Sequence, residues 1–347
     1  MSKLGIAGIA AAVALVTSAH AQNILTAETA SPNTAPGISI ISLSEAAAKE
    51  GVADIQVTAG QTLTNSVQNV AEGKSDIAAA PYILPFLLSR GVGPYAGLGK
   101  EKGAELAGNI AALYTYRISV QGLYAYDSAN ISGWDGLEGK TIYNGPPRGA
   151  ALTNARLLIK TNTGLDEGAG YTGIQVNWGQ AVKTIQDGSA DAFVLPMAFP
   201  DPRVSAALAS GKMTIFSTPK DVYEGEAFQN VGKIPGTVPV EIPLSDMGYG
   251  EDVTVVSDDD KFRGPGTVGA DIVNKSMDFD LAKSLTAAFI KNIETIYHAK
   301  APFMPGVWHG ETDIALTDMC GNNPIKYHPG ATAAWEEAGY TIPDCAK

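Results

Sequence analysis

The chain has 347 residues, and its 24 Lys and Arg against 36 Asp and Glu give a formal net charge of −12. No basic run or basic helix face offsets this charge in the sequence, so nucleic acid and anionic membranes are excluded as favoured partners. The length exceeds what a single hydrophobic core usually supports, and we therefore expect two domains.

The first 21 residues have the pattern of a cleavable secretory signal peptide. Lys3 gives a short positive start, residues 4–16 form an apolar run, and Ala19-His20-Ala21 has the small-x-small form of a site cleaved after Ala21. The run is too short to span a membrane, no later stretch supplies about 20 unbroken apolar residues, and no direct membrane insertion is expected. We predict an exported protein, with the periplasm favoured because an outer membrane retains a released product there.

Short strands and helices alternate in the next part of the chain. The sequence predicts strands at 24–29 and 54–58, each followed by a loop and a helix, and the two helices end at Gly51 and Gly73. Alternation at this spacing is typical of a parallel sheet covered by helices. Residues 83–110 lack a regular pattern.

A long strand and a second lobe are expected after this region. Residues 111–126 are rich in tyrosine and β-branched side chains and predict a long strand, or strand pair, that crosses between two lobes. The second lobe is expected to begin at 137–143, where 137–140 lead into a strand, followed by a loop at 144–149, a helix to Lys160 and a strand near 174–177.

The last third of the chain is expected to return to the first lobe. A Pro- and Gly-rich stretch at 233–250 is the candidate return, and 253–256 is the candidate second crossing strand. Apolar residues at helical spacing between 281 and 296 predict a helix with one face in the core.

Two segments, 73–81 and 188–196, read almost alike: Gly-x-x-Asp, four apolar residues and a proline. Each follows a helix-like segment, so the glycine is expected in a left-handed cap and the apolar residues in a buried strand. Chance recurrence of a common junction is one interpretation, and two similar α/β lobes facing one cleft is the one we favour. Because ligands of open α/β sheets bind beyond the carboxyl ends of strands, 81–82 and 196–197 are candidate cleft edges.

The two cysteines, Cys320 and Cys345, both lie near the C-terminus. In an exported protein this pattern predicts one disulfide that pins the last segment to the body. A metal site with His309 or His328 is the alternative, but the spacing fits no zinc pattern.

Several strings in a fixed order carry a resemblance to a known family. They are Leu-Glu-Gly-Lys at 137–140, Asn-Gly-Pro-Pro-Arg-Gly at 144–149, Gly-x-x-Asp-Ala at 188–192, and a tail motif at 328–340. Together with the signal peptide, they make the chain similar to an extracytoplasmic solute receptor of the TAXI branch of the tripartite ATP-independent periplasmic (TRAP) transporters. The resemblance covers most of the mature chain and is strongest at 113–198 and at the tail.

The resemblance implies a fold, a ligand class and a partner. The fold class is α/β, periplasmic-binding-protein type II-like, with two α/β lobes, a central cleft and crossing strands that act as a hinge. The expected division is 1–21 signal peptide, 22–125 first part of lobe 1, 126–240 lobe 2, and 241–347 return to lobe 1 and tail. The expected partners are a small organic anion, with a carboxylate favoured, and the membrane subunits of a TRAP-type transporter.

The chain departs from the family pattern at two places where ligand contacts are expected. Arg148-Gly149-Ala150-Ala151 replaces a Gly-Ser-Gly-Thr-like run, and 31–37 replaces a glycine- and tyrosine-rich loop. The identity of the ligand can therefore not be transferred from the better-known members of the family.

The loop at 144–149 is the first candidate site, because it ends a strand and opens a helix whose free N–H groups favour an anion. Asn144, Arg148 and Gly149 are its candidate ligand residues, and the Arg148 guanidinium can hold a carboxylate or sulfonate with two parallel bonds. The alternative is that Arg148 only caps a surface turn.

Further candidates follow the other predicted strands. Small polar residues there either contact the ligand or cap a helix, and the aromatic and thioether side chains form either a pocket wall or core packing. The polar candidates are Asn33, Thr34, Thr62, Asn65 and Ser66; the apolar ones are Tyr82, Trp178, Met197 and Phe199; Arg117 and Arg203 are alternative charge partners.

Two other functions stay open at this point. A periplasmic ligand-sensing subunit for a membrane signalling protein would have the same fold and a different partner. A periplasmic enzyme is less favoured, because the sequence has no Gly-x-Ser-x-Gly elbow, phosphate loop or dinucleotide fingerprint, and no cofactor is expected.

Overall fold

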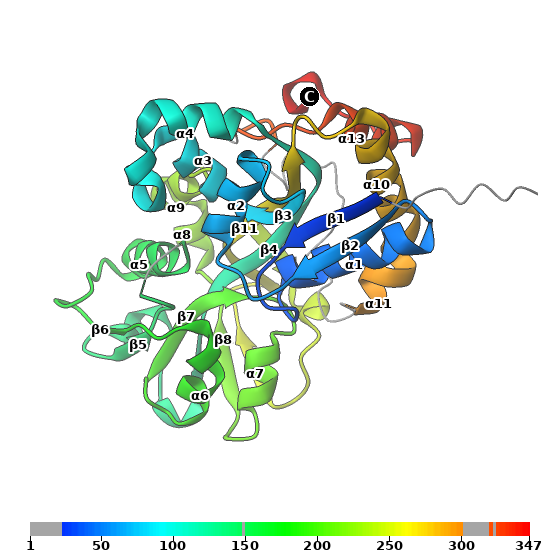
Figure 1. Cartoon of the computed structure of the whole chain (residues 1–347). Coiled ribbons are helices and arrows are strands. Elements are labelled where there is room, and N and C mark those ends of the chain that lie inside the picture. The colour runs from blue at the N-terminus through cyan, green and yellow to red at the C-terminus, as the bar shows by residue number, and fades with distance from the viewer. Residues whose placement is uncertain (1–22, 148–149, 301–318, 322–323) are drawn as a thin grey trace, which may run out of the picture.

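The computed structural model describes residues 23–147, 150–300, 319–321 and 324–347 (Figure 1). Its described strands form one sheet whose main path runs β2-β1-β3-β11-β4-β7-β5-β6, with β9 beside β11 and β8 between β4 and β10. The predicted signal peptide, 1–21, lies outside the described residues. No helix in the described ranges is both long enough and apolar enough to cross a bilayer.

The first strand group consists of three parallel strands, β1, β2 and β3, in the upper part of Figure 1. Helix α1 packs against β2, β3 and α10, and α10 packs against α13. The bounds are β1 Asn23–Glu28, α1 Ala35–Lys49, β2 Ala53–Thr58, α2 Leu63–Ala71, β3 Ile77–Pro81, α10 Phe279–Asn292 and α13 Pro329–Glu337.

Residues 83–110, for which no regular pattern was expected, form two helices, α3 (Ile83–Arg90) and α4 (Gly99–Gly108). The helical period is hard to see in the sequence because Pro85 stands in the first turn of α3, where proline is tolerated. Glycine then ends α3 at Gly91, whose backbone is left-handed with φ 60°.

The second strand group, β5 to β8 with β10, occupies the lower part of Figure 1. Strands β5, β6 and β7 are parallel, and β8 pairs with β10. The bounds are β5 Thr141–Tyr143, α5 Ala150–Thr163, β6 Thr172–Ile174, α6 Ala181–Gln186, β7 Ala192–Met197, α7 Pro202–Ala207, β8 Met213–Phe216, α8 Lys220–Glu224, α9 Glu226–Val231 and β10 Val253–Val256. Outside this group, β9 (Thr237–Pro243) pairs with β11, and the short α11 (His298–Lys300) lies beside α10 (Figure 1).

Two long antiparallel strands, β4 (Ile110–Tyr126) and β11 (Lys261–Asn274), connect the groups. The later part of β11 pairs with β3, and its earlier part pairs with β9. Strand β4 pairs with β11 along its first part and with β7 and β8 along its last part. The predicted long crossing strand at 111–126 is therefore confirmed.

The second crossing strand is β11, not 253–256. A strand does form at 253–256, but among the described strands it pairs with β8 alone, so its predicted crossing role is wrong. The predicted α/β class, with two units joined by crossing strands, is confirmed. The division at 22–125, 126–240 and 241–347 stays a prediction.

The repeated segments have the same local structure in both groups. Gly73 and Gly188 both end a helix with left-handed backbone, at φ 70° and 65°. The aspartate of each copy then holds a neighbouring parallel strand: Asp76 accepts a hydrogen bond from the Thr26 N–H at 2.8 Å, and Asp191 accepts one from the Thr141 N–H at 2.7 Å. The repeat thus fixes the strand order in each group.

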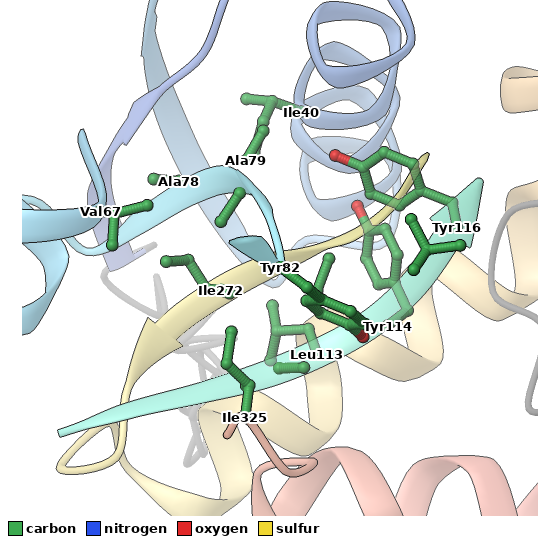
Figure 2. Close-up of a cluster of buried hydrophobic side chains, with 14 of the residues drawn as sticks. Ile40, Val67, Ala78, Ala79, Tyr82, Leu113, Tyr114, Tyr116, Ile272 and Ile325 are labelled. Atoms are coloured by element: carbon green, nitrogen blue, oxygen red, sulfur yellow. The ribbon is translucent and has the colours of Figure 1, made fainter. Parts of the chain in front are cut away.

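The core beneath the first strand group is built from β3, β4, β11 and α1 (Figure 2). A carboxylate, Asp271, lies fully buried on β11 inside it. It accepts hydrogen bonds from the hydroxyls of Tyr114 at 2.6 Å, Ser39 at 2.7 Å and Tyr116 at 3.0 Å. Because these donors come from α1 and β4, the carboxylate connects three elements.

The predicted disulfide between Cys320 and Cys345 is confirmed, with the two Cα atoms 5.2 Å apart. The C-terminal segment is further held by Trp335, whose indole N–H donates to the Leu113 carbonyl at 3.0 Å. The disulfide therefore closes the C-terminal segment on itself, and the Trp335 hydrogen bond attaches it to the crossing strand that begins at Ile110.

Candidate functional site

A cavity of about 510 Å³ lies between the two strand groups, where the crossing strands change partners. This volume falls within the range of pockets that hold small organic molecules. Its lining, in chain order, is Ala30, Ser31, Asn33, Thr34, Ala35, Pro36, Leu63, Pro81, Ile118, Ser119, Gln121, Ala150, Ala151, Asn154, Trp178, Gly179, Val182, Pro196, Met197, Ala198, Asp201, Pro202, Arg203 and Thr267.

One wall of the cavity is the start of α1. Thr34 is the N-cap: its hydroxyl donates to the Ser31 carbonyl at 2.7 Å and accepts weakly from the Gly37 N–H at 3.4 Å. A Cβ on Gly37 would lie 2.1 Å from the Ser31 carbonyl oxygen, so only glycine lets this loop fold against the first turn. The 15-residue helix directs the positive end of its dipole at the cavity.

The opposite wall includes the start of α5. Ala150, Ala151 and Asn154 line the cavity, and Ala150 is the first residue of this 14-residue helix. The first N–H groups of a helix have no partner within the helix. Two helix starts, one from each strand group, therefore lie on the same cavity.

The crossing strands supply polar groups between these walls. Ser119 and Gln121 come from β4, and Thr267 comes from β11. The Gln121 side-chain N–H donates to the Val194 carbonyl at 3.3 Å, which fixes its orientation. A molecule in the cavity would therefore contact both strand groups and the strands that join them.

A second-group cluster of Asp201, Arg203 and Trp178 forms the charged part of the lining. The Arg203 guanidinium donates to Asp201 from Nε at 3.1 Å and from Nη2 at 2.7 Å, and it lies 5.4 Å from the centre of the Trp178 ring. Nη2 also donates to the Pro196 carbonyl. Among the described residues, Nη1 has no hydrogen-bond partner.

The Asp201 carboxylate fixes the position of Arg203 and also caps helix α7. Its side chain caps α7 by accepting from the N–H groups of Arg203 and Val204, and it is only 2% exposed. Burial would lower the pKa of Arg203, but the attraction and hydrogen bonds of Asp201, together with the nearby Tyr124 and Tyr143, hold that pKa above its usual value. The guanidinium is therefore permanently charged and fixed in place.

Four of the candidate ligand residues line the cavity, Asn33, Thr34, Trp178 and Met197, and so do Pro81 and Pro196 of the two candidate cleft edges. Arg203, named as an alternative charge partner, lines it as well. Arg148 and Gly149 fall outside the described residues.

The remaining candidates lie nearby but are not part of the cavity lining. Thr62, Asn65 and Ser66 flank Leu63, which does line it; Thr62 and Asn65 are exposed, and Ser66 is buried. Tyr82 is fully buried, with its hydroxyl 2.8 Å from the sulfur of Met319. Arg117 is 6% exposed on β4.

Asn144 and Phe199 are oriented into the protein. Asn144 donates to Glu167 at 2.7 Å and accepts from Gln175 at 2.8 Å, so its amide ties the loop after β5 to its neighbours. Phe199 packs edge-to-face on Phe262, with ring centres 4.9 Å apart.

The sequence did not single out Ser119, Gln121, Thr267 or Asn154. The first three are polar residues inside long apolar strands, which is the signal that could have identified them. Asn154 lies one turn into α5, on the face of Ala150 and Ala151, and helical spacing from the loop would have suggested it.

The described lining combines apolar and uncharged polar side chains with one ion pair. Its described residues include no histidine, cysteine, lysine or glutamate, and its one carboxylate, Asp201, is paired with Arg203. Within the described ranges, no group of three His, Cys, Asp or Glu side chains is arranged to hold a metal ion.

Comparison with known proteins gives a family and several remote structural likenesses. A model described as the NMT1-like family matches residues 24–339. No curated protein of similar sequence was found.

The solved structures with a similar fold are distant in sequence. One is a TRAP periplasmic solute-binding protein of Rhodobacter sphaeroides, at 11% identity and TM-score 0.48, covering 94% of this chain and 96% of the other. Another is the aliphatic sulphonate-binding protein of Escherichia coli, at 10% identity and TM-score 0.44, covering 83% and 85%. A third is a TRAP solute-binding protein of Pseudomonas aeruginosa with bound L-malate, at 11% identity and TM-score 0.42, covering 81% and 88%.

Proposed function

The chain belongs to the NMT1-like family, and from that premise and the cavity we propose that it is an extracytoplasmic solute-binding protein that captures a small organic anion between its two strand groups. The observation that carries the proposal is the composition of the cavity wall. Residues from both groups and from both crossing strands line one space, so one molecule can contact all of them.

The polarity of the wall supports an anionic ligand. The starts of α1 and α5 present the positive ends of helix dipoles to the cavity, and Arg203 adds a fixed positive charge. The amide of Asn33 and the hydroxyl of Ser119 supply hydrogen-bond donors. Arg148 and Gly149, at the entrance to α5, are proposed as further contacts for the same anionic group that Arg203 binds.

The proposed mechanism is capture by closure. The strand groups rotate about β4 and β11, and a ligand that touches both groups stabilises the closed form relative to the open one. A shift from mostly open to mostly closed requires a difference in affinity of several kcal/mol, which a charge-assisted contact and a few hydrogen bonds supply.

The partner we propose is the membrane part of a TRAP-type transporter, with the chain in the TAXI branch. The support is the set of sequence motifs that carry this resemblance, at 137–149, 188–192 and 328–340. The signal-peptide pattern at 1–21 supports a periplasmic location for this encounter.

A thermal-shift screen of the exported protein against organic anions tests the function. We expect at least one monocarboxylate, dicarboxylate or sulfonate to raise the Tm with saturation, because a ligand at 100 times its Kd stabilises the folded state by about 2.7 kcal/mol. The bound molecule should be recovered chemically unchanged. Conversion of the ligand, or a flat Tm across the whole panel, would reject the proposal.

Two alanine variants, one inside the cavity lining and one outside it, test whether the ligand binds in the cavity. Replacing Asn33, which lines it, by alanine should weaken the best ligand by several-fold in calorimetry. Asn230→Ala is the matched control, because Asn230 is exposed and not among the lining residues. Equal affinities of both variants would place the ligand elsewhere.

A further inference from the structure

The described cavity wall contains one positive side chain, and that charge is already balanced. Asp201 and Arg203 are the charged residues of the described lining, and they form an ion pair with Nη2 and Oδ2 2.7 Å apart. One carboxylate of a ligand can still bind Arg203, but a second would lose its water without gaining a cation from the described wall, which is unfavourable. The chain's net charge of −12 opposes a dianion further.

Arg203 can still receive one anionic group. Its Nε and Nη2 are occupied by Asp201 and Pro196, while Nη1 lacks a hydrogen-bond partner within the described part of the chain. The pair fixes the guanidinium plane, so an incoming carboxylate or sulfonate meets a donor that is already oriented.

The rest of the lining is mostly apolar. Trp178 lies under Arg203 and is 43% exposed, a large exposed fraction for tryptophan. Ile118, Val182 and Met197 line the same space. A flat apolar group against this surface would bury the indole and gain aromatic stacking.

We infer that the ligand is an organic monoanion with a flat apolar body, whose single charged group binds Arg203 and whose body packs on Trp178. The inference rests on the proposed function and specifies the ligand class of the same cavity. Asp201 acts as a positioning residue, because it holds Arg203 and its side chain is only 2% exposed.

Calorimetry measures separately how the ligand's charge and its flat apolar body affect affinity. The four acids compared are phenylacetate, phenylmalonate, acetate and malonate. Phenylacetate carries one charge and a ring, and each of the other three changes the charge, the ring or both. We expect phenylacetate to bind at least tenfold more tightly than each of the others. A dicarboxylate that equals or exceeds phenylacetate would overturn the inference.

Two variants test which side chain binds the charged group of the ligand and which one packs against its apolar body. Arg203→Met should reduce phenylacetate affinity at least tenfold, whereas Trp178→Ala should reduce it by a similar factor and leave acetate almost unchanged. The matched controls are Arg90→Met, which removes a guanidinium that also lies 5.4 Å from an aromatic ring, and Tyr340→Ala, which removes an aromatic side chain that is also 43% exposed. Neither Arg90 nor Tyr340 lines the cavity, so both controls should bind like the wild type.

Arg203→Met leaves the buried Asp201 carboxylate without its cation and can impair folding. The double variant Asp201→Asn/Arg203→Met removes both charges and keeps a side chain that caps α7. Unchanged phenylacetate affinity in either folded variant would overturn the inference. If none of the four acids binds but another anion of the thermal-shift panel does, the inference fails and the proposed function stands; if no anion of the panel binds, the proposed function fails.

Discussion

Asp271 illustrates how a single buried group makes the molecule sensitive to pH. Burial raises the pKa of this carboxyl from its usual 3.8 to about 7, although hydrogen bonds from Tyr114, Ser39 and Tyr116 oppose the rise. The folded protein therefore holds the proton more tightly than the unfolded chain does. The stability that this group contributes is present in full below pH 3.8 and is lost as the pH rises towards 7.

Replacing Asp271 by asparagine should remove this pH dependence. The free energy of unfolding of the wild type, minus that of Asp271→Asn, should fall by about 3 kcal/mol between pH 5 and pH 8, since each pKa unit corresponds to about 1.4 kcal/mol. Urea unfolding at a series of pH values measures it. The pKa of His328 is lowered by burial, but that histidine is present in both proteins and cancels in the difference. A difference that stays constant over this range would contradict the assignment.

At this scale the sequence predicts some site residues well and others poorly. Met197 is the last residue of β7, and Asn33, Thr34 and Trp178 lie in the segments after β1 and β6, so all four line the cavity near the ends of strands. Asn144 occupies a similar position, but its amide is used by Glu167 and Gln175. No local pattern marks Arg203 as a lining residue, because its orientation is set by Asp201 and Trp178 in three dimensions.

Among the elements, β11 shows why a crossing strand was hard to find. It carries Gly264, Pro265, Gly266 and Gly269, residues that read as a loop in the sequence. The structure requires small residues there because the neighbouring backbones come close. A Cβ on Gly264 would lie 2.4 Å from the Gln121 carbonyl oxygen, and one on Gly269 would lie 2.5 Å from that of Ala80.

Gly269→Ala should therefore destabilise the fold. The added methyl group would push β11 away from β3, and we expect a loss of about 1–3 kcal/mol, the range for overpacking a well-packed core. Gly108→Ala is the control: its Cβ would meet nothing within 4 Å, and alanine is favoured over glycine in a helix such as α4. Chemical denaturation compares the two, and equal stabilities would show that β11 has room to shift.

Elements with strong local signals were predicted more successfully. The strands and glycine caps of both repeats follow from apolar runs between a helix end and a proline, and they form as expected. Helices α3 and α4 were missed because glycine and proline interrupt their short sequences. Packing of these two helices against each other supplies what local preference does not.

At the scale of the whole molecule, the repeat and the crossing strands define the architecture. Each copy of Gly-x-x-Asp fixes two parallel strands in its own group, so two similar units could be predicted from the sequence. The way they join could not, because it depends on pairing between β4 and β11, which are far apart in the chain. The cavity lies at that junction and was therefore predicted only in outline.

Hydrogen–deuterium exchange with and without the tightest anion of the thermal-shift panel tests the central claim most directly. If the ligand is held between the strand groups, backbone amides should gain protection in three lining segments at once: 33–36 at the start of α1, 118–121 on β4, and 197–203 after β7. Residues 253–256 on β10, which lie outside the lining, should exchange at the same rate in both states. Protection confined to one strand group, or absent from all three segments while the ligand is bound, would contradict the account.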